Sequence, residues 1–186
     1  MEIKVERITS WKRVVNAARF TERKEALDHE PSDEFKRRIL RAEHSPIRLL
    51  EFDIKIYDIP YFSAMHFVRH FMGIEKFVST QRPDRTNSGK TRHELPQDAP
   101  VNVWFAINAQ ALINISHVRM CNKADETTRK IWFAVADIIC YKDPILAEFL
   151  VPSCVAKGFC PEIKSCGWCK SDAFKGERMD YVEGEE

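Results

Sequence analysis

The sequence lacks long apolar runs, a strong excess of charge of either sign and any internal repeat. Its longest hydrophobic runs are interrupted by Asn, His, Arg or Asp, which excludes a membrane span. The first residues, MEIKVERITSWKR, mix charges and lack the apolar core of a signal peptide. A net charge of +1 argues against broad electrostatic binding of nucleic acid or membranes, so any basic site must be local.

What is present is typical of one globular domain. The chain has 186 residues, of which 44% are hydrophobic and 31% are charged, and it is long enough to bury a sizeable core. Its six cysteines, in a chain without a recognisable leader, predict a cytoplasmic protein whose thiols are reduced or bound to metal.

The spacing of apolar residues predicts both strands and helices. The clearest strand is LEFDIKIYDI at 50–59, in which Phe52, Ile54 and Ile56 share one face, and a second short strand is predicted at 74–78. Helical spacing predicts helices over 8–20, 34–42, 61–72, 101–121, 125–141 and 144–151. The longest of these opens after Pro100, and its predicted buried stripe consists of Trp104, Ile107, Ala111, Ile115 and Val118.

One stretch, HFVRHFMGIEKFVSTQRPDRTNSGKTR at 66–92, concentrates basic and polar side chains. On a helix, His66, Arg69 and His70 share a face, because residues three and four apart are neighbours there. The loop that follows adds Ser79, Gln81, Arg82, Arg85, Lys90 and Arg92. Guanidinium groups match phosphate geometry, so this stretch predicts a site for a phosphate-bearing ligand.

Two other patterns in this stretch lack a residue that they require. His66 and His70 have the i, i+4 spacing of metal ligands, but Phe67 stands where a zinc protease has Glu and no third ligand is evident nearby. NSGKT at 87–91 is similar to the end of a phosphate-binding P-loop, but Asp84 stands where the first glycine is required.

A polar line is predicted along the helix at 101–121. Asn108 and Arg119 are eleven residues apart, which places them within about 20° of each other around a helix axis. Lys123 lies one turn beyond Arg119. Such a line needs partners if it is buried, and the alternative interpretation is a solvated helix face.

Taken in order, these residues resemble the flavin-dependent thymidylate synthases, the ThyX family. The family signature is R-H-R followed after seven residues by S-x-R, with a His-Thr/Ser motif upstream and two Asn and an Arg downstream. The residues that match in type and spacing are Arg69, His70 and Ser79 in the signature, His44 and Ser45 upstream, and Asn108, Asn114 and Arg119 downstream. The resemblance covers roughly residues 35–150.

The resemblance implies an α+β fold with a central, mainly antiparallel sheet flanked by helices, assembled as a homotetramer with the cofactor between subunits. It implies the conversion of a pyrimidine nucleotide, dUMP, to dTMP with methylenetetrahydrofolate as carbon donor, FAD as hydride carrier and NADPH as reductant. Arg119 is the implied catalytic residue, because a guanidinium near the pyrimidine carbonyl stabilises charge developing on the ring.

The site residues that the resemblance implies fall into two groups. The cofactor-binding positions are His44, Ser45, Arg69, His70, Asn108 and Asn114. The substrate-binding positions are His66, Arg69, Ser79, Gln81, Arg82 and Arg119.

The sequence also departs from the family pattern. Phe71 replaces the second Arg of R-H-R, Phe77 replaces a nucleotide-binding Glu, and His66 replaces a Gln. Gln81 stands at the last Arg position, with Arg82 one residue late. Because a Phe in place of a carboxylate removes a hydrogen-bond acceptor, the alternatives are another pyrimidine nucleotide as substrate, or a catalytically degenerate nucleotide-binding or interaction protein.

The C-terminal region is rich in cysteine. Four cysteines in SCVAKGFCPEIKSCGWC give the spacing C-x5-C-x5-C-x2-C and consist of Cys154, Cys160, Cys166 and Cys169. Four thiols in a reduced protein predict a structural zinc site, with disulfides, redox exchange or unliganded thiols as alternatives. Cys121 and Cys140 lie in predicted helices and are interpreted as packing residues.

The chain is therefore divided into a ThyX-like domain at 1–151, a Cys-rich segment at 152–171 and a flexible acidic tail at 172–186. A small zinc-dependent nucleic-acid binder, using the Cys-rich segment and the basic loop at 82–92, is a further alternative. Near-neutral net charge counts against nucleic acid as a partner.

Overall fold

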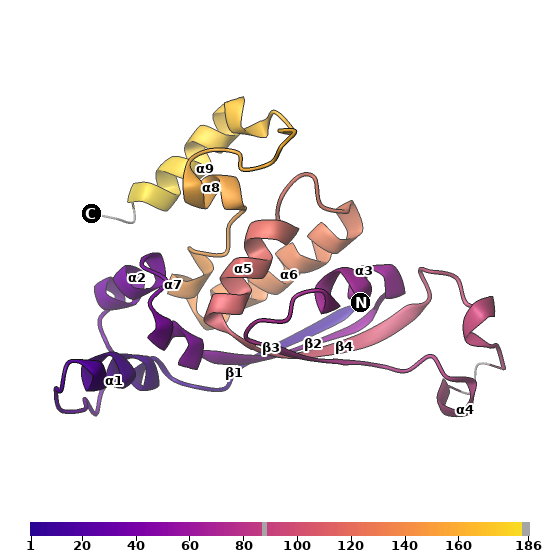
Figure 1. Cartoon of the computed structure of the whole chain (residues 1–186), viewed down its shortest axis with the longest axis horizontal. Helices are drawn as coiled ribbons and strands as arrows, with labels where there is room; N and C mark the ends of the chain where they lie inside the picture. The colour runs from indigo at the N-terminus through magenta and orange to yellow at the C-terminus, as the bar shows by residue number, and fades with distance from the viewer. Residues whose placement is uncertain (87–88, 184–186) are drawn as a thin grey trace.

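A computed structural model describes residues 1–86 and 89–183. It shows an α+β fold built on a four-stranded antiparallel sheet of order β1-β2-β4-β3 (Figure 1). The strands are β1 (Glu2–Arg7), β2 (Glu51–Pro60), β3 (Ile74–Val78) and β4 (Pro100–Asn108). The predicted α+β class with an antiparallel sheet is confirmed, as are the strands predicted at 50–59 and 74–78.

The two faces of the sheet differ in burial. In β2 the side chains of Phe52, Ile54 and Ile56 are fully buried, while the residues between them are partly exposed. β4 repeats the alternation, and its buried residues are Val101, Val103, Phe105 and Ile107. Because successive side chains of a strand point to opposite faces, one face of the sheet is packed on the core and the other is open.

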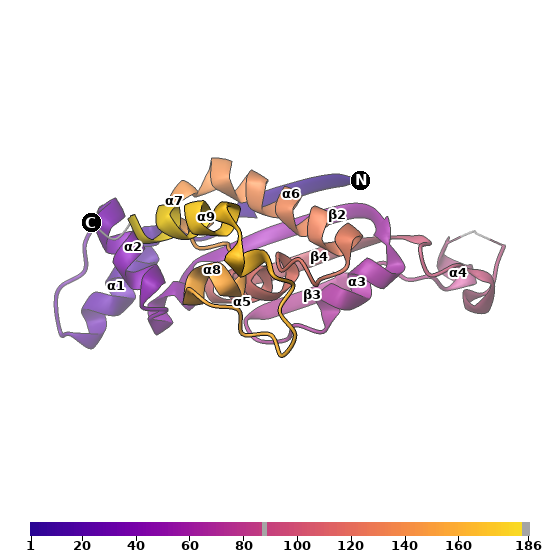
Figure 2. The ribbon, with the colours of Figure 1, turned by 90° about the horizontal axis from the view of Figure 1, so that it is seen from above.

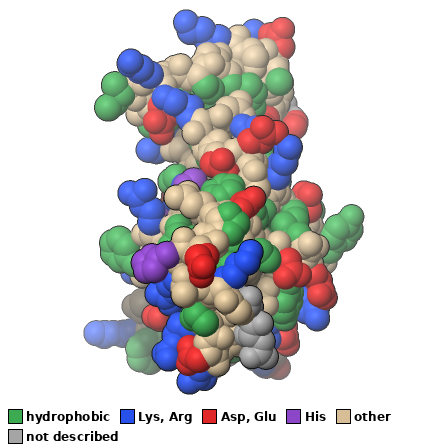
Figure 3. Space-filling view, turned by 90° about the vertical axis from the view of Figure 1, so that its right-hand side faces the viewer, with side chains coloured by type: hydrophobic (Ala, Val, Ile, Leu, Met, Phe, Trp, Pro, Cys, Tyr) green, Lys and Arg blue, Asp and Glu red, His purple; other side chains and the backbone are tan. Residues whose placement is uncertain are grey.

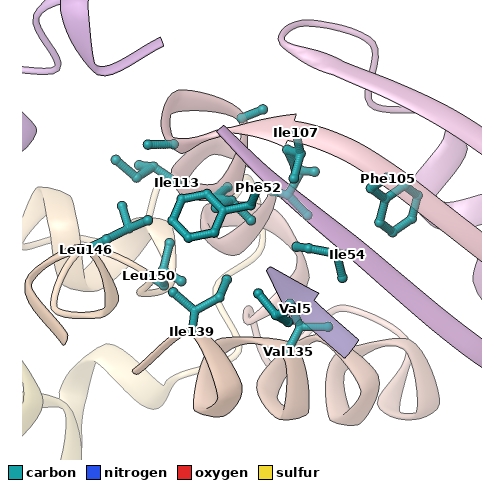
Figure 4. Packing of buried hydrophobic residues seen from close by; sticks show 14 of the residues in the cluster. Val5, Phe52, Ile54, Phe105, Ile107, Ile113, Val135, Ile139, Leu146 and Leu150 are labelled. Carbon is teal, nitrogen blue, oxygen red and sulfur yellow. The ribbon is translucent and has the colours of Figure 1, made fainter. Parts of the chain in front are cut away.

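Three helices cover the packed face. These are α3 (Tyr61–Val68), α5 (Ala109–Arg119) and α6 (Glu126–Lys142), and all three lie on the same side of the strands in Figure 1. Figure 4 shows Phe52 of β2 and Ile107 of β4 reaching toward Ile113 of α5, with Val135 and Ile139 of α6 closing the core from the other side.

The remaining elements lie around this body. They are α1 (Trp11–Thr21), α2 (Asp33–Arg41), the 3-10 helix η1 (Ser45–Leu49), α4 (Pro83–Thr86), η2 (Arg92–Glu94), α7 (Pro144–Ala147), α8 (Ser153–Lys157), η3 (Trp168–Lys170) and α9 (Asp172–Glu183). α1 and α2 occupy one end of the long axis and α4 the other, while α8 and α9 lie beyond α5 and α6 (Figures 1 and 2). Within the described residues, no helix is long and apolar enough to cross a membrane.

The predicted helices at 8–20, 34–42 and 125–141 are confirmed as α1, α2 and α6, and the one at 144–151 shortens to α7. Ser32 caps α2, because its hydroxyl accepts a hydrogen bond of 3.2 Å from the Phe35 N–H. In α6 the inward residues Ile131, Val135 and Ile139 are buried, while Ile138 is only partly buried.

The buried carboxylate of Asp143 joins three elements. It accepts a 2.7 Å hydrogen bond from the Trp11 indole of α1 and a 3.2 Å bond from Arg7 of β1. Its other oxygen accepts a bond from the Leu146 N–H and caps α7. Asp143 is 3% exposed, so its charge is balanced by these donors and fixes the edge strand to the helical layer.

The single helix predicted over 101–121 is wrong. Residues 100–108 are β4, and only Ala109–Arg119 is helical. Of the predicted stripe, Trp104 is 39% exposed and Val118 is 48% exposed. The strand leads directly into the helix, and Asn108 is the N-cap, its side chain accepting a 2.9 Å bond from the Ala111 N–H. Asn108 and Arg119 therefore do not share a helix face.

The helix predicted over 61–72 ends early, at Val68. Arg69 is its C-cap and His70 lies beyond it, so His66, Arg69 and His70 are not three residues of one regular helix face. The ammonium group of Lys76 in β3 donates to the carbonyl oxygens of Val68 and His70, which satisfies the helix end. Gly73 has a φ of 72° and turns the chain into β3.

The segment expected to be a flexible acidic tail is helical over Asp172–Glu183. Phe174 of α9 is 7% exposed and packs edge-on against Trp168, with ring centroids 5.3 Å apart. These two residues join α8 in a small second core. The end of the predicted tail, 184–186, lies outside the described residues.

Candidate functional site

The side chain of Arg119 is the centre of a polar cluster at the end of α5. Its Nε donates a 3.1 Å hydrogen bond to Nε2 of His70, and its terminal nitrogen donates a 2.5 Å bond to the His66 carbonyl oxygen. Both the guanidinium and the imidazole are partly buried. Two hydrogen bonds from different nitrogens fix the plane of the guanidinium, which leaves its other N–H groups for a ligand.

The electrostatics of the cluster favour an anion. Burial, followed by the positive charges of Arg119, Lys76 and Arg69, lowers the pKa of His70 to about 4. His70 is therefore neutral at pH 7, which agrees with Nε2 accepting a hydrogen bond from Arg119. The pKa of Arg119 is also lowered, by burial and by Arg69. All charged groups that act on His70 are cationic, so a negatively charged ligand relieves their mutual repulsion.

A second layer of hydrogen bonds holds His66. The hydroxyl of Thr128, in α6, lies 3.2 Å from Nδ1 of His66 and donates a 2.9 Å bond to Asp125. Thr128 is fully buried, and the Asp125 carboxylate also accepts a bond from the Thr128 N–H, which lowers the pKa of Asp125. The first turn of α6 thus fixes the end of α3 that receives Arg119.

Sequence reasoning did not assign Lys76, Asp125 or Thr128 to the site. The Asp-x-x-Thr spacing at the start of α6 is an N-cap signal, and it locates the turn but does not reveal that the hydroxyl reaches His66. Lys76 donates hydrogen bonds to backbone carbonyl oxygens, and because every residue has such a group, the sequence does not indicate which ones are its partners.

The chain is similar to known proteins in structure but not detectably in sequence. No protein-family model matches the sequence, and no curated protein matches it at a significant level. Among solved structures, the chain is similar to the flavin-dependent thymidylate synthase ThyX from Helicobacter pylori, complexed with FAD and dUMP. The TM-score is 0.64 at 16% identity, over 81% of this chain and 100% of that one.

The chain is also similar to the UMP/dUMP methylase PolB from Streptomyces cacaoi bound with 5-Br dUMP, with a TM-score of 0.62 at 16% identity. This match covers 85% of this chain and 96% of the other. The chain has the ThyX fold. At 16% identity the likeness shows a common fold, while substrate and reaction depend on the side chains present.

Within this ThyX fold, three predicted cofactor-binding residues lie around η1 and the middle of α5, apart from the Arg119 side chain. His44 and Ser45 are exposed at the start of η1, and Asn114 is exposed on α5. Gln110 donates hydrogen bonds to Glu43 and, at 3.4 Å, to Asn114. Asn114 and Arg119 are five residues apart on a helix, so they point to different sides of it.

Asn108 has a structural role in the ThyX fold. Besides capping α5, its backbone N–H donates a 3.0 Å bond to the Gly73 carbonyl oxygen. A Cβ on Gly73 would lie 2.6 Å from the Asn108 amide, so only glycine fits at this close approach. The predicted cofactor contact of Asn108 stays a prediction.

The predicted phosphate-side residues also lie apart from Arg119. Ser79 is exposed and pairs with Asn102, whose N–H donates a 2.9 Å bond to the Ser79 hydroxyl. It lines a shallow depression on the open face of the sheet, beside Phe77 and Trp104. Arg82 is bound through two nitrogens to Asp84, at 3.0 and 2.9 Å, in an exposed turn.

Gln81 is partly buried in the same connection, between Ser79 and α4. The end of the molecule that carries α4 is seen in Figure 3, where basic and acidic side chains are interspersed rather than gathered by sign. One chain therefore brings together His66, Arg69, His70 and Arg119, but it separates them from Ser79, Gln81 and Arg82.

The predicted metal ligands Cys154, Cys160, Cys166 and Cys169 lie away from this cluster, where α8 and η3 meet the end of α5. All six cysteines are free thiols. In the described part of the chain, no group of three or more His, Cys, Asp or Glu side chains is positioned to hold a metal ion. His66 and His70 accordingly have no further ligands there, and their ring nitrogens contact Thr128 and Arg119 instead.

Proposed function

We propose that this chain is a flavin-dependent methyltransferase that acts on a uridine nucleotide, converting dUMP to dTMP or methylating a related pyrimidine nucleotide. The observation that carries the proposal is the Arg119 guanidinium, held by the His66 carbonyl and the neutral His70 ring within the ThyX fold. A fixed, partly buried guanidinium is suited to a pyrimidine carbonyl, because it stabilises negative charge developing on the ring.

The residues present also fit the anionic groups of a nucleotide and of FAD. Arg69 is exposed beside the cluster and, among the described residues, its side chain forms no hydrogen bond or ion pair. Its charge is close enough to lower the pKa of both His70 and Arg119. Such an unpaired cation, next to two others, is a ready partner for phosphate oxygens.

In this proposal the roles of the chain's own residues are distinct. Arg119 orients and polarises the pyrimidine, His70 keeps the guanidinium plane fixed while staying uncharged, and Arg69 binds phosphate. FAD, when bound, supplies the hydride that completes the methyl group, with the carbon taken from methylenetetrahydrofolate and the reducing equivalents from NADPH. The cysteines of the C-terminal segment line a separate cavity, and the proposed reaction needs no thiol nucleophile.

We further propose that a second subunit completes the site, within a homotetramer. Ser79 and Gln81 lie apart from Arg119 in the same chain, so their phosphate role requires a neighbour. The open face of the sheet offers an apolar surface for it, since Phe77 is 55% and Trp104 is 39% exposed, with ring centroids 5.2 Å apart. Phe71, in place of the second Arg of the signature, is 77% exposed. Exposed aromatic surface of this kind marks interfaces.

A cytoplasmic location completes the proposal, because six free thiols are typical of a reducing compartment.

The decisive experiment combines binding and turnover. Purified protein is titrated with FAD, dUMP and UMP, and the melting temperature is followed, since a ligand that binds only the native state must raise it. Methylation is then assayed with methylenetetrahydrofolate, FAD and NADPH. Stabilisation together with turnover supports the methyltransferase. Stabilisation without turnover leaves the degenerate nucleotide-binding protein, for which the exposed Phe71 and Phe77 are the favouring observation. No stabilisation by any of the three ligands would overturn both.

A further inference from the structure

The Cys-rich segment folds back so that its four cysteines line one cavity. This cavity, of about 130 Å³, lies between the end of α5, α8 and η3, and its lining includes Cys154, Cys160, Cys166 and Cys169. Two glycines make this possible. Gly158, with a φ of 77°, ends α8 between the first two cysteines, and Gly167, with a φ of 86°, turns the chain between the last two.

The four thiols share the lining of this one cavity. Cys154 is buried, Cys160 and Cys169 are partly buried, and Cys166 is exposed. Four cysteine thiols on one cavity supply the ligand set of tetrahedral Zn²⁺.

We propose that Cys154, Cys160, Cys166 and Cys169 bind one structural Zn²⁺ ion. As the side chains now lie, no three in the described part of the chain form a finished metal-binding group, so binding must draw the thiols inward. The connection that carries Cys160 and Cys166 can supply this movement, since residues 161–167 are all exposed. Cys154 is buried at the start of α8 and Cys169 lies on η3, so both are held by the packed side of the cavity.

A bound zinc ion would stabilise the C-terminal segment, whose own hydrophobic core is small. The second core consists of Cys154, Val155 and Phe174, with Trp168 and a few partly buried residues against it. A core of this size stabilises a segment of about thirty residues poorly, and a metal ion commonly compensates. Zinc bound at Cys169 would fix η3, and with it the Trp168 ring on which α9 packs.

The site is independent of the proposed methylation, and its test needs no enzyme assay. The full-length protein is purified in reductant, supplied with Zn²⁺, desalted and analysed for zinc by mass spectrometry. Three variants are compared: Cys169→Ser, Cys166→Ser and Cys140→Ser. Cys166 is exposed, so its replacement removes a proposed ligand without disturbing buried packing, and Cys140 is an exposed thiol on α6 that serves as the matched control.

We expect one zinc per chain in the wild type and in Cys140→Ser, and its loss in the other two variants. A chelator should lower the melting temperature of the wild type but not that of Cys166→Ser. Zinc-free wild-type protein after reconstitution would overturn the proposal, as would zinc retained by both Cys169→Ser and Cys166→Ser. So would an intact-mass decrease that shows disulfides formed in place of bound metal.

Discussion

Arg119 and Arg82 were both predicted to bind the nucleotide, and their surroundings are opposite. Arg119 is partly buried, and its two hydrogen-bond partners are a carbonyl oxygen and a neutral imidazole. Arg82 is 60% exposed and binds the carboxylate of Asp84, two residues away in the same turn. The first guanidinium is fixed without being neutralised, whereas the second is neutralised on the surface.

This difference separates a binding residue from a surface ion pair. A cation held by uncharged acceptors keeps its full charge for a ligand. Because the folded protein already orients it, no rearrangement is needed when the ligand binds. A cation already paired with a carboxylate must break that pair before it binds phosphate, and an exposed pair gains little in water.

The largest effect is expected for Arg119→Lys. Lysine keeps the charge but cannot reach both His66 and His70 with a fixed fork, so the orientation of the pyrimidine-binding group is lost. We expect kcat/KM for the uridine nucleotide to fall about 100-fold or more. The same change at the other arginine, Arg82→Lys, is the matched control and should leave kcat/KM nearly unaltered. Equal losses in the two variants would contradict the contrast.

A smaller but measurable loss is expected for Thr128→Val. The change removes the hydroxyl that contacts His66 and Asp125, and it leaves the fully buried Ser63 hydroxyl without that partner, at a cost of about 1–3 kcal/mol in the free energy of unfolding. Urea denaturation measures the cost. The neighbouring Thr127 is exposed, so Thr127→Val should change stability by less than about 0.5 kcal/mol. Indistinguishable denaturation curves for the two variants would show that the hydroxyl does not hold the cluster.

The same contrast explains what sequence could predict. The strand at 50–59 follows from a local pattern, and the structure confirms it. The failure at 101–121 has a local cause as well. β4 passes into α5 at Asn108 without an intervening glycine or proline, and Trp104, Ile107 and Ala111 happen to fit helical spacing.

The site was predictable only in part, for a physical reason. Resemblance pointed to Arg69, His70 and Arg119, which the structure brings together. Whether an arginine is free for a ligand depends on its neighbours in space. The pairing of Arg82 with Asp84 is local and could have been inferred, while the bond from Arg119 to the His66 carbonyl joins residues 53 positions apart. Long-range partners of this kind are not encoded in any short motif.

A third prediction concerns pH. His70 has a pKa of about 4 in the folded protein against about 6.5 in an unfolded chain, so the unfolded state binds more protons between these values. Its contribution to stability is therefore intact above pH 6.5 and is lost as the pH falls toward 4. NMR titration should find the low pKa, and Arg119→Gln should raise it by removing a neighbouring cation. Arg82→Gln should leave it unchanged, and an equal rise in both variants would contradict the proximity of Arg119.

The smallest effect is expected for Arg82→Ala. Its guanidinium already donates two hydrogen bonds to Asp84 in a solvent-exposed turn. The pair therefore contributes at most about 1 kcal/mol to the free energy of unfolding. We expect the dissociation constant for dUMP or UMP, measured by calorimetry, to change less than about threefold and the melting temperature to stay the same. Asp84→Ala separates the two explanations of such a small effect. If Arg82 does not affect nucleotide affinity because it is paired with Asp84, the Asp84→Ala change should tighten phosphate binding in a salt-dependent way. If nucleotide affinity stays the same after its release, Arg82 is simply too far from the nucleotide, and the α4 turn plays no part in the site of any subunit.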